Sequence, residues 1–109
     1  MSVTPKMLCQ ESLSAGATAV YTTPADHRTQ ITEIWITNTS TTDSRDVALF
    51  AHGTAAGNTI AQKITVEAEA TTIIDGSKIV LDAAEVLAAS QDAGTDVILT
   101  AYGVEEDLS

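Results

Sequence analysis

Few residues in this sequence have the type and spacing that catalysis needs. The two histidines, His27 and His52, are far apart, and neither has metal-ligand spacing to another histidine or to the single cysteine, Cys9. His27 sits in a turn beside Asp26 and Arg28, and His52 ends a strand before Gly53, so we expect solvated histidines. Cys9 lies in an apolar run, where a buried, inert thiol is the common outcome. A nucleophilic Cys–His pair stays open on sequence distance alone.

Sequence motifs of the common catalytic and phosphate-binding loops are missing. There is no G-x-S-x-G turn for a nucleophilic serine. There is also no G-x-x-x-x-G-K or G-x-G-x-x-G loop to bind phosphate. We therefore predict no catalytic residues, no cofactor and no enzymatic activity.

The 15 acidic residues suggest a calcium site as one hypothesis, because Ca²⁺ binds six to eight oxygen ligands, often in loops. Asp43 and Asp46 flank a Ser/Thr-rich loop, and Asp92 and Asp96 flank Gly94. Neither pair follows the spacing of an EF-hand. Solvated loop acids without a metal are therefore the expectation, and a calcium site is the alternative.

The chain has only four aromatic residues, Tyr21, Trp35, Phe50 and Tyr102. Lectin-like sandwiches use exposed aromatic rings beside polar groups as platforms for sugars. Trp35 and Tyr102 are candidates for such a glycan contact if their strands are neighbours. The competing interpretation is a structural role for both side chains, in the core or at a subunit contact.

The charge balance restricts the partners of this protein. The 109 residues include 15 acidic and 5 basic side chains, for a net charge of −10. Phosphate binding needs clustered Lys and Arg, so we expect contact neither with nucleic acid nor with an anionic membrane. No apolar run approaches the roughly 18 residues of a membrane span, and the first ten residues do not resemble a secretory signal. A single cysteine excludes an intramolecular disulfide and fits synthesis in a reducing cytosol.

Short β-strands separated by turn signals are the elements that would position these residues. The clearest strand spans residues 29–38, in which alternation places Ile34 and Ile36 toward the core and Trp35 on the opposite face. Ile31 falls on the Trp35 face in this pattern. The other predicted strands are 7–13, 17–22, 47–52, 59–67, 71–75, 78–81 and 95–104, with a turn at Gly76.

Residues 82–90 permit two interpretations. Their composition favours a helix, and Asp82 followed by Glu85 resembles a capping box, but intrinsic propensity is weak evidence. The short length between strand-like neighbours favours a turn at 82–85 and a strand from Val86. We prefer the strand and keep the helix as the alternative.

About eight short strands without a convincing long helix predict an all-β fold. The expected architecture is a single antiparallel β-sandwich, jelly-roll-like or immunoglobulin-like. Residues 1–12 would form an N-terminal arm or first strand, residues 13–104 the sandwich domain, and residues 105–109 a frayed acidic tail. The strand order is not determined by these patterns.

Four segments resemble a recurring pattern in small β-sandwich virion proteins of tailed bacteriophages. Residues 20–25 (VYTTPA) resemble the family's (I/L)YT-x-PA strand end, and residues 31–40 (ITEIWITNTS) its I-x-x-I-x-I-x-NTS strand. Residues 79–90 (IVLDAAEVLAAS) and 97–105 (VILTAYGVE) resemble its (V/L)-L-x-AGD-x-I…V-T-(V/I)-x-G-V-E close. Ala84 stands where the family usually has glycine. The resemblance covers most of the chain after residue 17.

The resemblance implies a structural protein of the virion, either a capsid decoration (cement) protein or another minor component of the head, neck, tail or fibres. It implies no catalytic residues. Such a protein would act by self-assembly, with a trimer as one expected homo-oligomer, and by binding other virion proteins. It would be made in the host cytoplasm and located in the virion. The alternative function is a carbohydrate-binding module of a tail or fibre that contacts the host surface through Trp35 or Tyr102.

Overall fold

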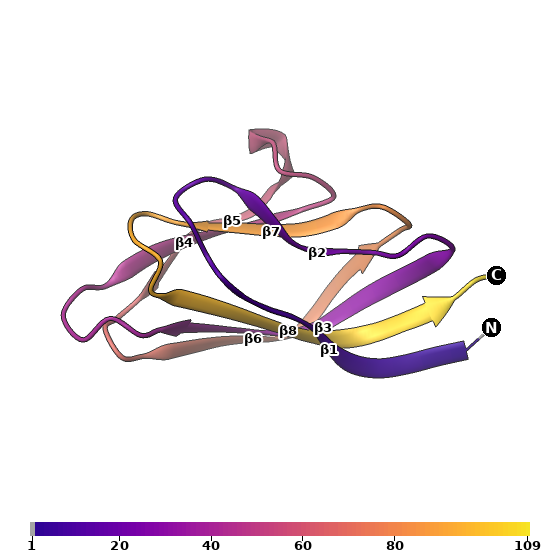
Figure 1. The fold of residues 1–109 in the computed structure, drawn as a ribbon, viewed down its shortest axis with the longest axis horizontal. Helices are drawn as coiled ribbons and strands as arrows, with labels where there is room; N and C mark the ends of the chain where they lie inside the picture. The colour runs from indigo at the N-terminus through magenta and orange to yellow at the C-terminus, as the bar shows by residue number, and fades with distance from the viewer. Residues whose placement is uncertain (1) are drawn as a thin grey trace.

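The protein folds into two packed antiparallel sheets of four strands each (Figure 1). The computed structural model describes the backbone of residues 2–109 and the side chains of residues 3–75 and 79–109. The elements in chain order are β1 (Ser2–Ser12), β2 (Thr18–Thr22), β3 (His27–Asn38), β4 (Arg45–Ala51), the short 3-10 helix η1 (Ala56–Asn58), β5 (Thr59–Val66), β6 (Thr71–Leu81), β7 (Val86–Gln91) and β8 (Val97–Asp107). Within residues 2–109 no helix is long and apolar enough to cross a membrane.

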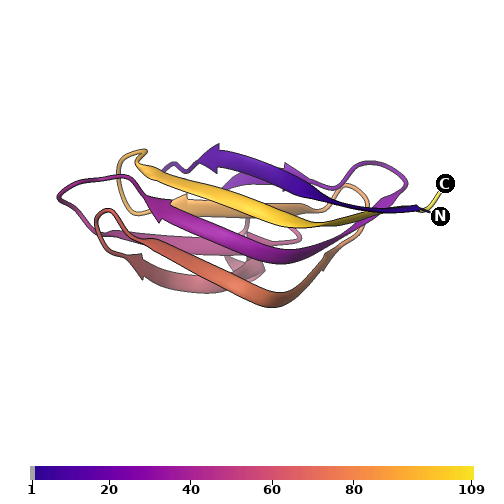
Figure 2. The ribbon, with the colours of Figure 1, turned by 90° about the horizontal axis from the view of Figure 1, so that it is seen from below.

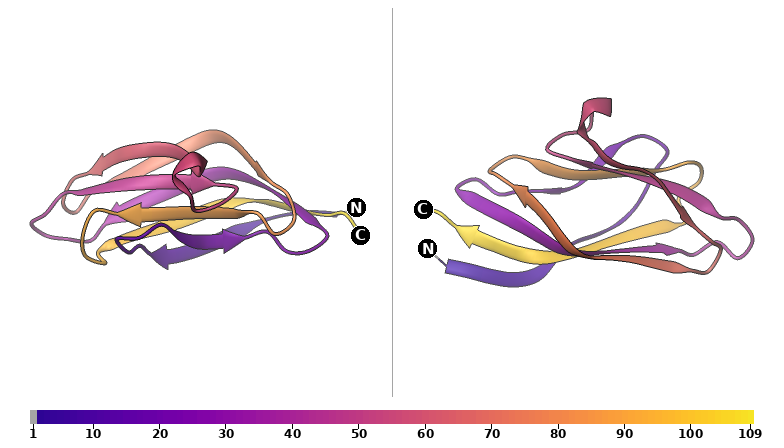
Figure 3. Two further views of the ribbon diagram at one scale, coloured as in Figure 1. Left: turned by 90° about the horizontal axis from the view of Figure 1, so that it is seen from above. Right: turned by 180° about the vertical axis from the view of Figure 1, so that it is seen from behind.

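The strand order identifies the fold as a jelly roll. One sheet, which we call sheet A, has the order β1-β8-β3-β6 and is seen from below in Figure 2. The other, sheet B, has the order β2-β7-β4-β5 and faces the viewer in the left view of Figure 3. Except for the β4–β5 hairpin, consecutive strands lie in different sheets, as in an eight-stranded jelly roll. The predicted all-β sandwich is confirmed, and the strand order decides against the immunoglobulin-like alternative.

Aliphatic side chains between the two sheets form the core. Ile34 and Ile36 of β3 are fully buried, as the alternation predicts. Each such side chain contributes about 1.5–3 kcal/mol on burial. Tyr21 is the one aromatic side chain of the described core. The other large members are Leu13, Ile31, Val47, Leu49, Val66, Leu81, Leu87, Val97 and Leu99.

One predicted face assignment in β3 is wrong. Alternation alone places Ile31 beside Trp35, but Ile31 is fully buried with Ile34. The register of β3 shifts between Ile31 and Glu33 against both of its neighbours: against β8 the extra residue of the β-bulge is Thr32, and against β6 the extra residues belong to β6. The bulge reverses the alternation once, and the apolar sides of both halves of β3 therefore point inward.

Register shifts in three strands of sheet A fall at the same level. They occur at Leu8 of β1, at Thr32 of β3 and between residues 75 and 79 of β6. Because a bulge bends its strand, the whole sheet bends there, and its outer face is convex along the strands (Figure 1). At this level β8 has Gly103, where a Cβ atom would lie only 2.2 Å from the carbonyl oxygen of Gln30. The close approach of β3 and β8 therefore requires glycine.

Several predicted boundaries also change. The turn expected at Gly76 does not form, because β6 is continuous from Thr71 to Leu81 and pairs with β3 on both sides of the shift. β8 extends to Asp107, since β1 and β3 both pair with its last residues, and the expected tail 105–109 is wrong for three of its residues. Residues 82–85 form a turn that leads into β7, so the strand interpretation of 82–90 is correct. Residues 2–12, for which an arm or a strand is expected, pair with β8 as β1.

Candidate functional site: the outer face of sheet A

Motif residues from distant parts of the sequence meet at one end of the sandwich. Tyr21 of the YTTPA segment donates a hydrogen bond to Glu105 of the GVE segment, and its hydroxyl also lies 2.7 Å from that of Thr29. The Glu105 side chain is 11% exposed and accepts a second bond from Lys6 at 3.1 Å. Burial alone would raise the pKa of Glu105, but the bonds from Tyr21 and Lys6 lower it below its ordinary value. Burial and the bond to Glu105 raise the pKa of Tyr21 to about 12.

Residues 38–40, the NTS segment, connect strands and loops at the opposite end of the sandwich. The amide of Asn38, which is 1% exposed, donates to the carbonyl oxygens of Asp43 and Val66 at 2.8 and 3.0 Å. The side-chain oxygen of Asn38 accepts a bond from the backbone N–H of Ser40, and the Thr39 hydroxyl bonds the carbonyl of residue 96. The residues that carry the resemblance to phage proteins thus connect strands and loops. Their role in these contacts is structural.

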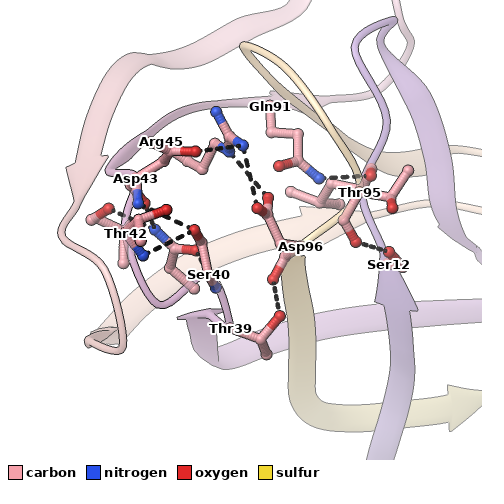
Figure 4. Close-up of polar contacts among 12 residues, drawn as sticks. Ser12, Thr39, Ser40, Thr42, Asp43, Arg45, Gln91, Thr95 and Asp96 are labelled. Atoms are coloured by element: carbon pink, nitrogen blue, oxygen red, sulfur yellow. Dashed lines mark hydrogen bonds and ion pairs between the residues drawn. The ribbon is translucent and has the colours of Figure 1, made fainter.

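Three of the four aspartates considered as calcium ligands, Asp43, Asp92 and Asp96, interact with Arg45, whereas the Asp46 carboxylate contacts Thr65 and Lys63. The Arg45 guanidinium forms two hydrogen bonds with Asp96, at 2.9 and 3.1 Å (Figure 4), and lies 3.6 Å from Asp43. The backbone N–H of Asp92 bonds the carbonyl of Asp46. The hydrogen-bonded pair raises the pKa of Arg45 and lowers that of Asp96. Arg45 thus supplies the positive charge at this cluster, and the described side chains include no group of three His, Cys, Asp or Glu that could hold a metal ion.

The contacts of the cysteine and the histidines do not pair a nucleophile with a base. His27 Nδ1 lies 2.8 Å from the carbonyl oxygen of Ala25, and His52 Nδ1 lies 3.1 Å from the carboxylate of Glu85. Cys9 is buried, and burial raises the pKa of its thiol to about 11. Neither histidine contact involves Cys9, so the structure does not bring these three candidates together.

Trp35 and Tyr102 lie on neighbouring strands and on the same, outer face of sheet A. Tyr102 of β8 pairs with Glu33 of β3, and Trp35 is two residues further along β3, which makes the two rings diagonal neighbours. Each side chain is 39% exposed, and the Trp35 indole N–H donates to the Glu33 carboxylate. The condition that their strands be neighbours is met, and neither ring lies in the core.

The exposed apolar side chains are concentrated on this same face. Six of the eight large apolar residues that are exposed in the described part of the chain belong to it. Met7 pairs with Tyr102, and Trp35 pairs with Ile73, so the group spans all four strands. Single exposed apolar residues are ordinary, whereas a contiguous patch marks an interaction site. We call this group the apolar face: Val3, Met7, Trp35, Ile73, Val80 and Tyr102.

Sequence reasoning identified two residues of the apolar face, Trp35 and Tyr102, and missed the other four. One available signal was the adjacent apolar pairs of β6, 73–74 and 79–80. A strand with one face in water should alternate apolar and polar residues. Two neighbouring apolar residues therefore indicate that both faces of the strand are covered, one by the core and the other by a partner.

Two neighbouring carboxylates lie within the apolar face. Glu33 and Asp75 pair across β3 and β6. Among the described side chains, neither has a Lys, Arg or His within 4.0 Å. Like charges opposite one another in a sheet are unfavourable. A cationic group on a bound partner would therefore stabilise this part of the face.

The outer face of sheet B differs in shape and chemistry. It contains a groove of about 640 Å³, lined among others by Ala48, Ser90, Asp46 and Lys63. Ala48 of β4 and Ser90 of β7 pair with each other, and the small size of both side chains creates the hollow. Lys63 is 70% exposed and lies 3.8 Å from Asp46. Sheet A thus offers a convex apolar surface and sheet B a polar groove.

The solved structures that share this fold at low sequence identity include the following two. A chain of the Bacillus endospore appendages, which are disulfide-linked pili, matches with a TM-score of 0.58 and 13% identity, over 99% of this chain and 90% of that one. A chain of the acidic stable capsid of Helicobacter pylori bacteriophage KHP30 matches with a TM-score of 0.57 and 10% identity, over 96% and 87%. No protein-family model and no curated protein matches the sequence. The fold is therefore shared with subunits of a pilus and of a phage capsid.

Proposed function

We propose that this protein is a structural subunit of a tailed-bacteriophage virion, either a capsid decoration protein or another minor head or neck protein. It acts by self-assembly and by binding other virion proteins, and it catalyses no reaction. The observation that carries the proposal is the concentration of six exposed large apolar side chains on one sheet of a jelly roll. Jelly rolls recur in viral capsids, and the phage-like segments extend over both halves of the chain.

The outer face of sheet A has the size of a stable protein interface. Its strands have 11 or 12 residues. At about 3.3 Å per residue and about 4.8 Å between strands, the face measures roughly 35 by 19 Å, or about 650 Å² before side-chain relief is counted. Standard interfaces bury about 800 Å² on each partner. Contacts of this area across a capsid joint would raise the free energy needed to open the shell.

The net charge of −10 supports a protein partner over a nucleic acid. It would keep the free subunit soluble before assembly and away from packaged DNA. Surface acidity and a local apolar face together fit a subunit that is stored free and then assembled.

Cys9 supports assembly without disulfides, unlike that of the disulfide-linked endospore pili. It is the only cysteine, it is 8% exposed, and burial raises its pKa to about 11. The thiolate is the species that forms disulfides, and it is scarce at neutral pH when the pKa is this high. Subunit contacts in this protein are therefore proposed to be noncovalent.

Light scattering behind size exclusion tests the proposal. The native chain should elute as a stable trimer or larger ring, with a mass that is a multiple of 11.3 kDa. Tyr102→Glu should reduce the mass to that of one chain without loss of folding, because the ring is exposed. Leu108→Glu changes an equally exposed apolar residue outside the apolar face, and it should keep the native mass. A native chain that is monomeric, and also absent from purified particles of the phage that encodes it, would overturn the proposal.

A carbohydrate-binding module is the second candidate. It is favoured by the exposed neighbours Trp35 and Tyr102, with the Glu33 carboxylate between them. Small ligands bind mainly in concave sites, whereas this face is convex along the strands, and the pocket of about 160 Å³ that Val3 and Val80 of this face line includes neither Trp35 nor Tyr102. Binding to immobilised glycans that is abolished by Trp35→Ala, in a protein that stays folded, would favour this candidate. No binding to any glycan of the array would rule it out.

A further inference from the structure

We infer that the apolar face of one subunit docks into the sheet B groove of a second copy of this chain. The inference rests on the proposed function and names the first partner of the apolar face. The apolar face and the groove are the outer faces of the two sheets, so they lie on opposite sides of the sandwich. Each subunit would then use one surface toward the copy before it and the other toward the copy after it.

The shapes of the two surfaces fit each other better than either fits itself. Sheet A bends at its aligned bulges, which makes the apolar face convex along the strands (Figure 1). Tyr102 and Trp35 lie next to this bend and are each 39% exposed. The groove, of about 640 Å³ over Ala48 and Ser90, has room for both rings. Two convex faces placed against each other would touch only along the bend.

The charges favour the same pairing. In a two-fold contact of the apolar face with itself, residue i of one copy meets residue j of the other and the reverse. With the two-fold axis near β3, the carboxylates of Glu33 and Asp75 would approach those of the other copy, and neither has a Lys, Arg or His within 4.0 Å among the described side chains. The groove presents Lys63, which is 70% exposed, together with the carboxylates of Asp46 and Asp92. A groove contact can therefore bring Lys63 to Glu33 and Asp75, whereas Arg28, beside Val3 and Val80 on the same face, is already paired with Asp82 and Glu106.

Lys63 is also the least engaged cation among the described side chains. The other three, Lys6, Arg28 and Arg45, each hold a carboxylate at 2.9–3.2 Å, whereas Lys63 lies 3.8 Å from Asp46. Asp46 has a second partner, because the Thr65 hydroxyl donates to it at 2.8 Å. Lys63 can therefore turn toward Glu33 or Asp75 of the next copy without leaving Asp46 unbonded.

A contact of this type determines the form of the assembly. Because two different surfaces meet, the contact is heterologous, and it repeats from subunit to subunit. It closes into a ring if the rotation between neighbours divides a full turn, and otherwise it grows into a filament. Because the two surfaces lie on opposite sides of the sandwich, successive subunits stack in nearly one direction, and a filament or a ring larger than a trimer buries every apolar face.

Mixing two blocked variants tests the inference directly. Trp35→Glu disables the apolar face, and Ser90→Trp fills the groove; both positions are on outer faces, and circular dichroism checks the fold. Each variant alone should be monomeric, because it retains only one of the two surfaces. Mixed in equal amounts they should form a one-to-one dimer of twice 11.3 kDa and nothing larger. If the apolar face paired with itself, Ser90→Trp would still associate alone.

A charge exchange provides the second arm. Asp75→Lys and Lys63→Glu should each weaken association at least tenfold, and the double variant should recover most of it. Glu67→Lys, an exposed charge reversal beyond the end of β5, is the control and should associate as the native chain does. A double variant no stronger than the single variants would overturn the pairing of Lys63 with the apolar face.

The outcomes separate this inference from the proposed function. A native oligomer whose blocked variants keep the native mass, or fail to form the mixed dimer, overturns the groove contact and leaves the structural role standing. A native chain that is monomeric at every concentration but present in purified virions overturns self-docking and assigns the apolar face to another virion protein. A chain that is monomeric and absent from virions overturns both.

Discussion

The buried motif residues and the apolar face come from the same strands but depend on different contacts. In β8, Gly103 and Glu105 point inward and contact β3 and Tyr21, whereas Tyr102 points outward and is 39% exposed. In β3, Trp35 likewise points outward, whereas its neighbours Ile34 and Ile36 are buried. The residues that carry the resemblance to phage proteins therefore maintain the fold, and the residues that would bind a partner lie between them. Inward substitutions should change stability and leave assembly intact, and outward ones should do the opposite.

Gly103→Ala should have the largest effect on stability. The added Cβ would lie 2.2 Å from the backbone oxygen of Gln30, and backbone within a paired strand cannot move aside as a flexible side chain does. Overpacking of this kind costs about 3 kcal/mol or more, which corresponds to a fall in Tm of about 10 °C or more. Thermal denaturation followed by circular dichroism measures it. At Gly57 a Cβ meets nothing within 4 Å, so the control variant Gly57→Ala should keep the native Tm. A native Tm for Gly103→Ala as well would show that the inward position does not control stability.

Removal of one tyrosine hydroxyl from each region compares the buried motif residues with the apolar face. The variants are Tyr21→Phe for the first region and Tyr102→Phe for the second. Tyr21→Phe takes a donor from Glu105 and a partner from Thr29, and the loss should be about 1–3 kcal/mol because the carboxylate stays buried. Tyr102→Phe removes an outward hydroxyl and should change stability by less than about 0.5 kcal/mol. Urea unfolding of the two variants gives both values. Equal losses would show that inward and outward positions are not energetically distinct.

Acid should destabilise the protein through the same buried carboxylate. The pKa of Glu105 is lower in the folded protein, so its stabilising contribution is present above the unfolded pKa of about 4.3 and is lost as the pH falls toward the folded pKa. Asp96 and Glu85 also have lowered pKa values and add to the loss. Glu105→Gln should therefore make the decline between about pH 5 and pH 3 shallower without abolishing it. Urea midpoints across this range test the point, and an unchanged pH dependence would contradict it.

Sequence patterns correctly predicted the features that depend on a single strand. They missed the features that depend on how several strands pair. Alternation correctly placed Ile34 and Ile36 in the core, and Trp35 on the outer face. The bulge at Thr32 was missed because it belongs to a shift shared by three strands, and strand order is not encoded in any one of them. The same reason explains the aspartate cluster, since Arg45 and Asp96 are 51 positions apart in the sequence and meet only in the folded chain. Candidate contact residues were predictable singly, but the face that unites them was not.

Ala84 stands where the phage pattern usually has glycine. Its substitution should have the smallest effect on stability. Its φ is +69°, a left-handed conformation that costs an L-residue roughly 1 kcal/mol or more. The turn is held there because Ala84 N–H donates to the Thr23 carbonyl and Asp82 N–H donates to the Glu85 carboxylate.

Ala84→Gly relieves this strain but gains backbone freedom in the unfolded chain, so we expect a net gain of about 0.5 kcal/mol and a rise in Tm of about 2–4 °C. Gly94→Ala is the reciprocal control: φ is +74° and the new Cβ would lie 3.2 Å from Arg45, so its Tm should fall. Both variants should keep the native solution mass, because both turns lie outside the apolar face. A change in that mass would mean that the turns, and not only the outer faces, take part in assembly.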